Sequence, residues 1–187
     1  MLDAALRCVV RSGLLAVGIE EIRREAMSSP SSVYNLFANI SELTGALLMR
    51  TFERLFTHLA DRVLRTRTAR RAVLVLVEAH IDWVLDHAAE GLFMYQATSL
   101  ELAPGARGEI QRRKAELLEP IAEHLAPFIG RGGLPRWSVL QFDVVLLGPS
   151  HEACRRYLAG APLDVSWMRH ELPRLAWTSM ARGRRSP

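Results

Sequence analysis

Histidine and cysteine are the side chains of this sequence best suited to catalysis or metal binding, and their spacing favours neither. His151-Glu152 and His170-Glu171 are adjacent pairs, which point to different sides of a helix and chelate one ion poorly. His80 and His87 share a helical face, where a pocket wall or a core histidine is the simpler interpretation. No H-E-x-x-H, C-x-x-C, G-x-S-x-G or glycine-rich phosphate loop occurs. We therefore expect no enzymatic activity, no metal and no cofactor.

A run of hydroxyl and amide side chains between residues 29 and 35 has different chemistry. Ser29 can cap a short helix, and Pro30 fits its first turn, where a missing N–H costs nothing. Helical spacing predicts that Val33, Leu36 and Phe37 face inward. The outer side would then carry the polar groups that can contact base edges or phosphates in a major groove. The candidate DNA-binding residues are Ser29, Pro30, Ser31, Ser32, Tyr34 and Asn35.

The elements that must position these groups are helical throughout. Apolar residues recur at helical spacing, no alternating strand pattern occurs, and hydrophobic residues form 49% of the 187 residues, enough for a core. The pattern predicts an all-α fold of about nine helices. Gly13 ends the first, Ser41 caps the fourth with Glu42 in its first turn, and Pro135 can start the eighth. The expected ranges are 2–12, 19–26, 30–37, 42–63, 72–88, 92–102, 108–129, 137–159 and 163–182.

The first forty-five residues resemble the DNA-binding domain of the TetR/AcrR (tetracycline repressor) family. The similarity rests on Leu2-Asp3-Ala4-Ala5-Leu6, Gly13, Ile22, Ala26, Ser29, the Tyr34-x-x-Phe37 pair and Glu42-Leu43. It implies a helix-turn-helix DNA-binding domain over residues 1–45 and a helical ligand-binding and dimerisation domain over 46–187. It further implies a homodimer formed through the last two long helices, with two recognition helices about 34 Å apart on a palindromic operator.

The headpiece departs from the family pattern in ways that bear on DNA affinity. Met27 stands where the family usually has glycine, which suits a turn of positive φ. Ile40 replaces a lysine that holds a phosphate in the family, and Gly18 lacks a capping hydroxyl. Residues 1–45 carry four arginines against five carboxylates, a net charge of 4 − 5 = −1. Because phosphate contacts dominate DNA affinity, this headpiece is electrostatically weak.

The second domain is expected to hold a small apolar or amphipathic effector. Pro149 removes a backbone hydrogen bond and should kink its helix, which can open a cavity. Large aromatic and apolar side chains supply apolar surface with a few polar groups, although ordinary core is the simpler interpretation of any single one. The candidate ligand-binding residues are Trp83, Met94, Tyr95, Trp137, Phe142 and His151.

Charge permits nucleic-acid binding without requiring it. The net charge is +4 and the pI about 9.7, and every basic residue except Lys114 is arginine. Arg62, Arg65, Arg67, Arg70 and Arg71 form a cluster that is either a solvated surface or a phosphate contact. Cys8 lies among apolar residues and is expected in the core. No signal segment or membrane-length apolar run occurs, so we expect a soluble cytoplasmic protein.

These observations favour a ligand-responsive transcriptional regulator, expected to act as a repressor that an effector releases from its operator. The alternative is a small-molecule-binding helical dimer whose degenerate headpiece binds DNA weakly. An all-α enzyme is a third and less supported hypothesis.

Overall fold

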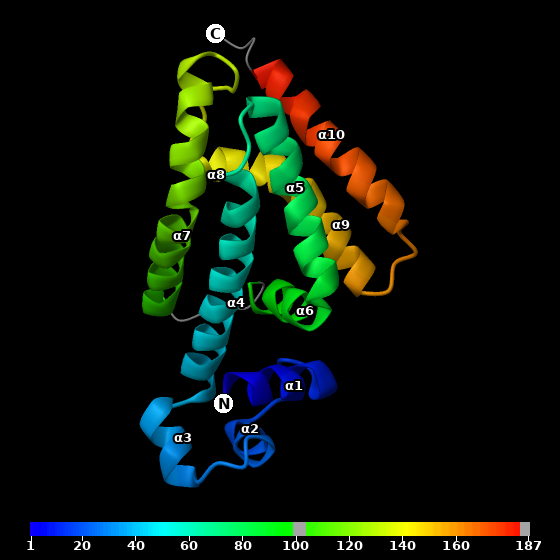
Figure 1. The fold of residues 1–187 in the computed structure, drawn as a ribbon. Helices are drawn as coiled ribbons and strands as arrows, with labels where there is room; N and C mark the ends of the chain where they lie inside the picture. Colours follow the sequence, from blue (N-terminus) through cyan, green and yellow to red (C-terminus); the bar gives the residue numbers. More distant parts are fainter. Residues whose placement is uncertain (99–103, 184–187) are drawn as a thin grey trace. The chain divides into compact units, whose positions relative to one another are not determined.

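The computed structural model describes residues 1–98 and 104–183, which form an all-α fold (Figure 1). Within these residues no strand occurs, and nine continuous helices are present when α8, the π-helical segment η1 and α9 are taken as one. This confirms the predicted fold class. The elements are α1 Leu2–Ser12, α2 Ile19–Glu25, α3 Pro30–Leu36, α4 Ile40–Val63, α5 Ala69–Asp86, α6 Ala88–Ala97, α7 Pro104–Gly130, α8 Val139–Phe142, η1 Asp143–Leu147, α9 Gly148–Leu158 and α10 Val165–Gly183.

Several helix ends differ from the sequence prediction. Ser41 is not the cap of α4, because Asn39 Oδ1 accepts from the Glu42 N–H at 3.0 Å and the Glu42 carboxylate accepts from the Ala38 N–H at 2.9 Å. Glu90, which falls between the helices expected over 72–88 and 92–102, lies inside α6, where it is 3% exposed. Its carboxylate accepts a hydrogen bond from Arg54 at 2.5 Å, so burial is compensated by an ion pair.

Proline positions account for other differences. Pro104 begins α7, which was expected to start at residue 108, and α7 continues through Pro120 and Pro127. Pro135 precedes the eighth helix without starting it; Ser138 caps α8 in a capping box with Gln141. The end of the predicted helix 92–102 lies partly outside the described residues, as does residue 103.

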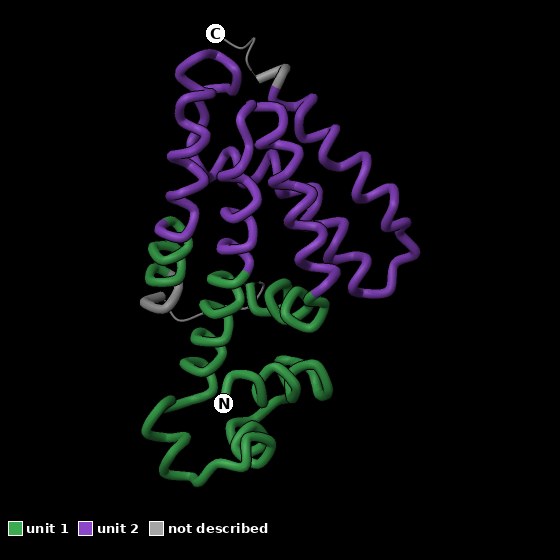
Figure 2. The backbone as a smooth tube through the Cα atoms, in the orientation of Figure 1, with its two compact units in different colours: residues 1–54, 87–115 green, residues 55–86, 116–187 purple. Residues whose placement is uncertain are grey.

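The chain forms two compact units (Figure 2). The first comprises Met1–Arg54 and His87–Ala115, and the second comprises Leu55–Asp86 and Glu116–Pro187. This grouping follows packing within each unit. A functional boundary after residue 45 remains a proposal.

In the first unit α1 packs against α2 and α6. Ala5, Cys8, Ile22 and Val33 are fully buried, which places Cys8 in the core as predicted. The inward face of α1 is Ala4, Ala5, Cys8 and Val9, whereas Val10 is 49% exposed. Small side chains on this face let the helices approach closely.

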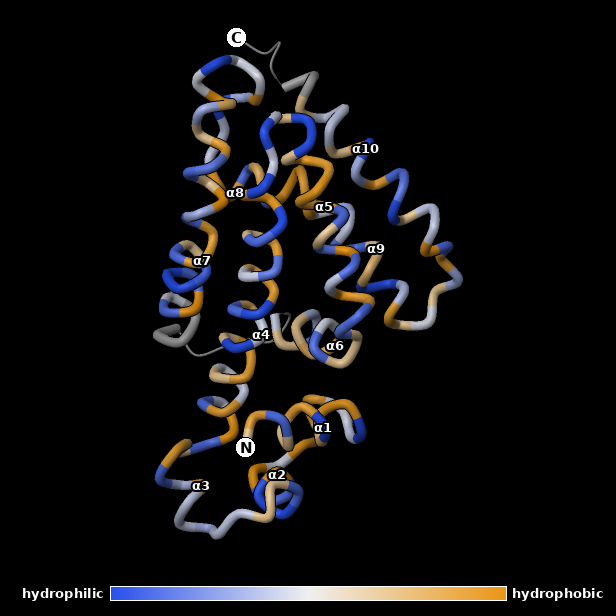
Figure 3. Tube along the Cα trace, viewed as in Figure 1, coloured by the Kyte–Doolittle hydropathy of each residue, from blue (hydrophilic) through white to orange (hydrophobic). Residues whose placement is uncertain are grey.

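In the second unit α5 packs against α10, α9 and η1. Ten of its residues are buried, in keeping with its apolar sequence. Figure 3 shows hydrophobic and hydrophilic stretches alternating along α4 and α7. His80 is fully buried on α5. Its Nδ1 lies 3.1 Å from Ser150 Oγ, and the Ser150 hydroxyl donates to the Leu147 carbonyl at 2.9 Å. Among the described residues no helix is long and apolar enough to cross a membrane.

Candidate DNA-binding headpiece and ligand pocket

The turn between α2 and α3 is a Schellman motif that ends α2. The Ser28 N–H donates to the Arg23 carbonyl at 3.1 Å, and the Met27 N–H donates to the Arg24 carbonyl at 3.0 Å. This pair of bonds requires a left-handed residue at the position of Met27, whose φ is +50°. Met27 is 95% exposed, so its side chain gains little packing in return. The sequence argument that glycine suits this position is therefore confirmed by the backbone.

The N-terminus of α3 is held by serine hydroxyls. Ser29 Oγ accepts from the Ser32 N–H at 3.2 Å, and Pro30 occupies the first turn, both as predicted. The Ser29 hydroxyl also lies 3.0 Å from that of Ser31 and 2.8 Å from that of Ser32. The local sequence therefore sets both the start of α3 and the direction of its first side chains.

The outer side of α3 is exposed. Ser31, Ser32 and Asn35 are exposed, and Tyr34 is 50% exposed, with its hydroxyl 3.4 Å from Glu20 Oε1. These four side chains, with Ser29 and Pro30, form the candidate DNA-binding surface. No basic residue lies on α3. Contacts from this surface would thus be hydrogen bonds from hydroxyl and amide groups.

The expectation that Leu36 faces inward is wrong, because it is 63% exposed. Helix α3 has only seven residues and ends at Leu36, with Phe37 already in an extended conformation. Val33 is fully buried and Phe37 half-buried, so these two residues seat the helix without Leu36.

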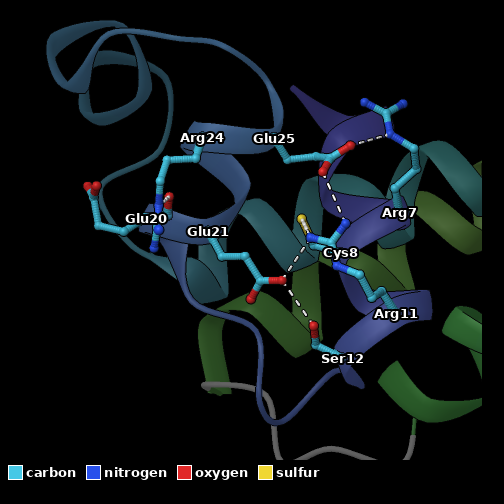
Figure 4. Close-up of polar contacts among 8 residues, drawn as sticks. All are labelled: Arg7, Cys8, Arg11, Ser12, Glu20, Glu21, Arg24 and Glu25. Carbon is cyan, nitrogen blue, oxygen red and sulfur yellow. Dashed lines mark hydrogen bonds and ion pairs between the residues drawn. The ribbon is translucent and has the colours of Figure 1, made fainter.

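The arginines of α1 are occupied by glutamates of α2 (Figure 4). Glu25 lies between two guanidinium groups: Arg7 donates to it at 2.7 Å and Arg11 at 3.1 Å. Arg11 also donates to Glu21 at 3.0 Å, and the Ser12 hydroxyl donates to the same carboxylate. Hydrogen bonds from Arg7 and Arg11 lower the pKa of Glu25, and those from Arg11 and Ser12 lower the pKa of Glu21. These guanidinium groups join α1 to α2.

The same holds for the arginines of α2. Arg23 donates to Glu20 at 2.8 Å, which lowers the pKa of that carboxyl group, and Arg24 donates to the Glu20 carbonyl at 3.3 Å. In the first 45 residues, each of the four arginines thus has a protein partner. A phosphate must compete with that partner, which reinforces the weakness suggested by the net charge of −1.

The second unit contains an apolar cavity of about 80 Å³. Trp137 and Phe142, two of the candidate ligand-binding residues, line it with their ring centroids 5.7 Å apart. Asp143 is the one ionisable residue that lines it. The remaining lining residues are aliphatic: Leu76, Leu118, Ile121, Ala122, Leu125, Ile129, Val139, Leu146 and Leu147.

The π-helical segment η1 forms one wall of this cavity, through Asp143, Leu146 and Leu147. The helix expected over 137–159 runs from Val139 to Leu158, with this π-helical segment in its middle. Pro149 lies in the first turn of α9, directly after η1, and cannot donate a backbone hydrogen bond. The wider π turn lies directly before the proline, where the sequence predicted a kink.

Sequence reasoning missed the wall that α7 supplies. Leu118, Ile121, Ala122, Leu125 and Ile129 follow the spacing of one helical stripe, and this pattern could have identified them.

The other candidate ligand-binding residues do not line this cavity. Trp83 is 2% exposed in the second unit, and Met94 is 2% exposed in the first. Tyr95 is half-buried in α6. His151 is half-buried in α9, and its ring centroid lies 4.2 Å from that of His80 in an edge-to-face arrangement. The described residues contain no group of three or more His, Cys, Asp or Glu that could hold a metal ion.

Comparison with protein-family models and with curated protein sequences finds no match. Comparison with solved structures finds many similar folds over nearly the whole chain. FadR from Bacillus subtilis, a transcriptional regulator in complex with stearoyl-CoA, has a TM-score of 0.80 at 13% identity, covering 95% of this chain and 96% of FadR.

Two further neighbours have the same architecture. A TetR family transcription regulator from Marinobacter aquaeolei VT8 has a TM-score of 0.72 at 18% identity, covering 95% of this chain and 92% of that one. The TetR family regulator PfmR from Thermus thermophilus has a TM-score of 0.73 at 15% identity, covering 95% and 96%. The chain therefore has the TetR-type fold.

Proposed function

We propose that this chain is a TetR-type transcriptional regulator, which binds DNA through the headpiece of α1–α3 and responds to a small molecule bound in its second unit. The observation that carries this proposal is the outer side of α3. Four exposed side chains with hydroxyl or amide groups stand together on a helix that follows a capped turn, and they lie in a TetR-type fold. That arrangement suits readout of base edges.

Fluorescence polarisation with a labelled duplex from the region upstream of its own gene tests DNA binding. Asn35→Ala is expected to weaken binding at least fivefold, because a lost base contact costs about 1–3 kcal/mol. Gln111→Ala, at an exposed position on α7, is the matched control and should bind as the parent does. An equal loss in both variants would place the DNA contact elsewhere.

The salt dependence of the same assay separates the leading proposal from its alternative, a small-molecule-binding dimer with a degenerate headpiece. The alternative is favoured by the arginine–glutamate pairs and the net charge of −1. Ile40→Lys adds a cation where the resemblance implies a phosphate contact. This variant should bind more tightly and steepen the slope of log K against log[salt] by about 0.9. If the parent and Ile40→Lys bind no DNA even at low salt, the alternative stands.

The apolar cavity supports an effector with a small apolar part. Ala122 lines the cavity on α7, and Ala126 lies one turn further along the same helix at an exposed position. Ala122→Phe should therefore abolish the binding of 1-octanol, followed by tryptophan fluorescence, while Ala126→Phe should preserve it. Equal binding by both variants would exclude the cavity as the effector site.

Exposed apolar residues on the last helices support the proposed homodimer. Trp167 and Leu175 on α10 are 44% and 52% exposed, and Leu140 and Val144 are also exposed. A second copy of the chain would remove this surface from water. Light scattering at micromolar concentration should give a dimer that Trp167→Arg dissociates and Leu15→Arg, 86% exposed in the first unit, does not. A monomeric parent protein would refute the dimer.

The remaining expectations belong to the same proposal. The regulator acts as a repressor on a palindromic operator, in the cytoplasm, with no catalytic activity and no cofactor.

A further inference from the structure

The arginine cluster of residues 62–71 has no role in the function proposed above. The structure gives it a definite location in the second unit, at the end of α4, the loop after it and the start of α5. Arg62, Arg65, Arg67 and Arg71 line one pocket of about 500 Å³. This volume is within the range of small-molecule sites.

Three of these guanidinium groups are available to bind an anion. Arg71 pairs with Glu78 at 3.3 Å inside the pocket. In the part of the chain that the structure describes, Arg62, Arg65 and Arg67 have no ion pair or side-chain hydrogen bond, and all three are exposed. They differ in this from the headpiece arginines, whose glutamate partners hold them.

The carboxylates of the pocket do not neutralise it. Asp82 pairs with Arg169 of α10 at 2.8 Å, and Glu78 pairs with Arg71. Asp61 is the third carboxylate of the lining. With the two pairs set aside, three unpaired arginines face one carboxylate, a balance of +3 − 1 = +2.

The N-terminus of α5 at the pocket also favours an anion. Thr68 caps α5, accepting from the Arg71 N–H at 3.2 Å, so the positive end of the α5 dipole lies beside Arg67 and Arg71. At the end of α4, the Val63 carbonyl accepts hydrogen bonds from the Thr66 N–H at 2.9 Å and the Thr66 hydroxyl at 2.7 Å. The negative end of α4 is thereby partly satisfied.

We propose that this pocket binds a small anion with two linked phosphoryl groups. A guanidinium group matches phosphate oxygens in a bidentate fork, and three such groups suit an anion that offers several oxygens around more than one centre. The site is separate from the apolar cavity, because the two share no lining residue. It does not depend on whether the headpiece binds DNA.

Isothermal titration of the full chain with inorganic pyrophosphate tests the proposal. Orthophosphate, sulfate and succinate at matched ionic strength are the comparison anions. Pyrophosphate is expected to bind at least tenfold more tightly than any of them. It should also raise the thermal midpoint, since a ligand that binds only the folded state stabilises it.

Arg67→Gln and Arg70→Gln form a matched pair. Both arginines are exposed and lie three residues apart, but only Arg67 lines the pocket. Arg67→Gln should weaken pyrophosphate binding about tenfold, because it loses charge-assisted hydrogen bonds, and Arg70→Gln should weaken it less than twofold. Neither side chain is buried, and circular dichroism should give the parent's spectrum for both.

Three outcomes would overturn the proposal: no heat of binding with millimolar pyrophosphate, equal affinity for pyrophosphate and the comparison anions, or equal losses in the two variants. None of these outcomes bears on DNA binding, which the polarisation assay measures separately.

Discussion

Met27 allows a direct test of how much a left-handed backbone conformation costs at a residue other than glycine. It occupies the left-handed position of the Schellman turn with φ of +50°, and its side chain is 95% exposed. A residue with a Cβ pays about 1–2 kcal/mol for this conformation. Glycine removes that cost, but it has more freedom to lose on folding, worth about 0.5–1 kcal/mol. The difference predicts that Met27→Gly stabilises the protein by about 0.5–1 kcal/mol.

Thermal or urea unfolding followed by circular dichroism measures this difference. For a chain of this length, about 1 kcal/mol corresponds to about 2–4 °C in the midpoint. Both backbone hydrogen bonds of the turn come from N–H groups that glycine retains. Met27→Val should destabilise, because a β-branched residue tolerates this conformation least.

Leu15→Gly is the matched control for Met27→Gly. Leu15 is also an exposed apolar residue of the first unit, at 86%, but Met27 is the one non-glycine residue with positive φ in the described chain. Leu15→Gly should therefore lower stability by about 0.5–1 kcal/mol. If both glycine variants lower stability equally, the argument from left-handed strain is refuted.

Two further predictions concern buried charges. Burial lowers the pKa of His80 well below 6.5, so below that pH the unfolded chain binds a proton that the folded chain does not. The free energy of unfolding should therefore fall as the pH drops below about 6.5. His80→Asn keeps a hydrogen-bond donor to Ser150 and should flatten a plot of the unfolding free energy against pH. An unchanged slope in His80→Asn would contradict this assignment. Arg54→Met leaves the buried Glu90 carboxylate without its cation and should lower the free energy of unfolding in urea by about 3 kcal/mol. The double variant Arg54→Met/Glu90→Met should recover most of this loss. If it recovers none, the unpaired carboxylate is not the cause of the destabilisation.

Much of the fold follows from local sequence patterns. The apolar residues that recur at helical spacing along α4 are buried, and so are ten residues of the apolar helix α5; those of α4 are Leu47, Leu48, Phe52, Leu55, Leu59 and Val63. Ser29 and Pro30 start α3 as predicted, because a cap and a first turn depend on residues within one helical turn. The family resemblance also indicated that the backbone at Met27 adopts a positive φ.

Local sequence patterns do not predict burial where it depends on a residue distant along the chain. Glu90 falls between the helices predicted over 72–88 and 92–102, and only its ion pair with Arg54 explains how the carboxylate can be buried inside α6. Trp167 and Leu175 follow helical spacing, yet they lie on an exposed side of α10. Helical spacing does not distinguish apolar residues buried within the chain from apolar residues that a second copy of the chain would bury.

The sequence by itself determined the helical class, the helix-turn-helix resemblance and the polar outer side of α3, since each depends on residues close together along the chain. Tertiary structure alone decided which charges are available. It pairs the headpiece arginines with glutamates up to 18 residues away, and it leaves three arginines between the end of α4 and the start of α5 facing a pocket. Charge counts are fixed by composition, but whether a guanidinium group can bind a new anion depends on what lies within a few ångströms of it.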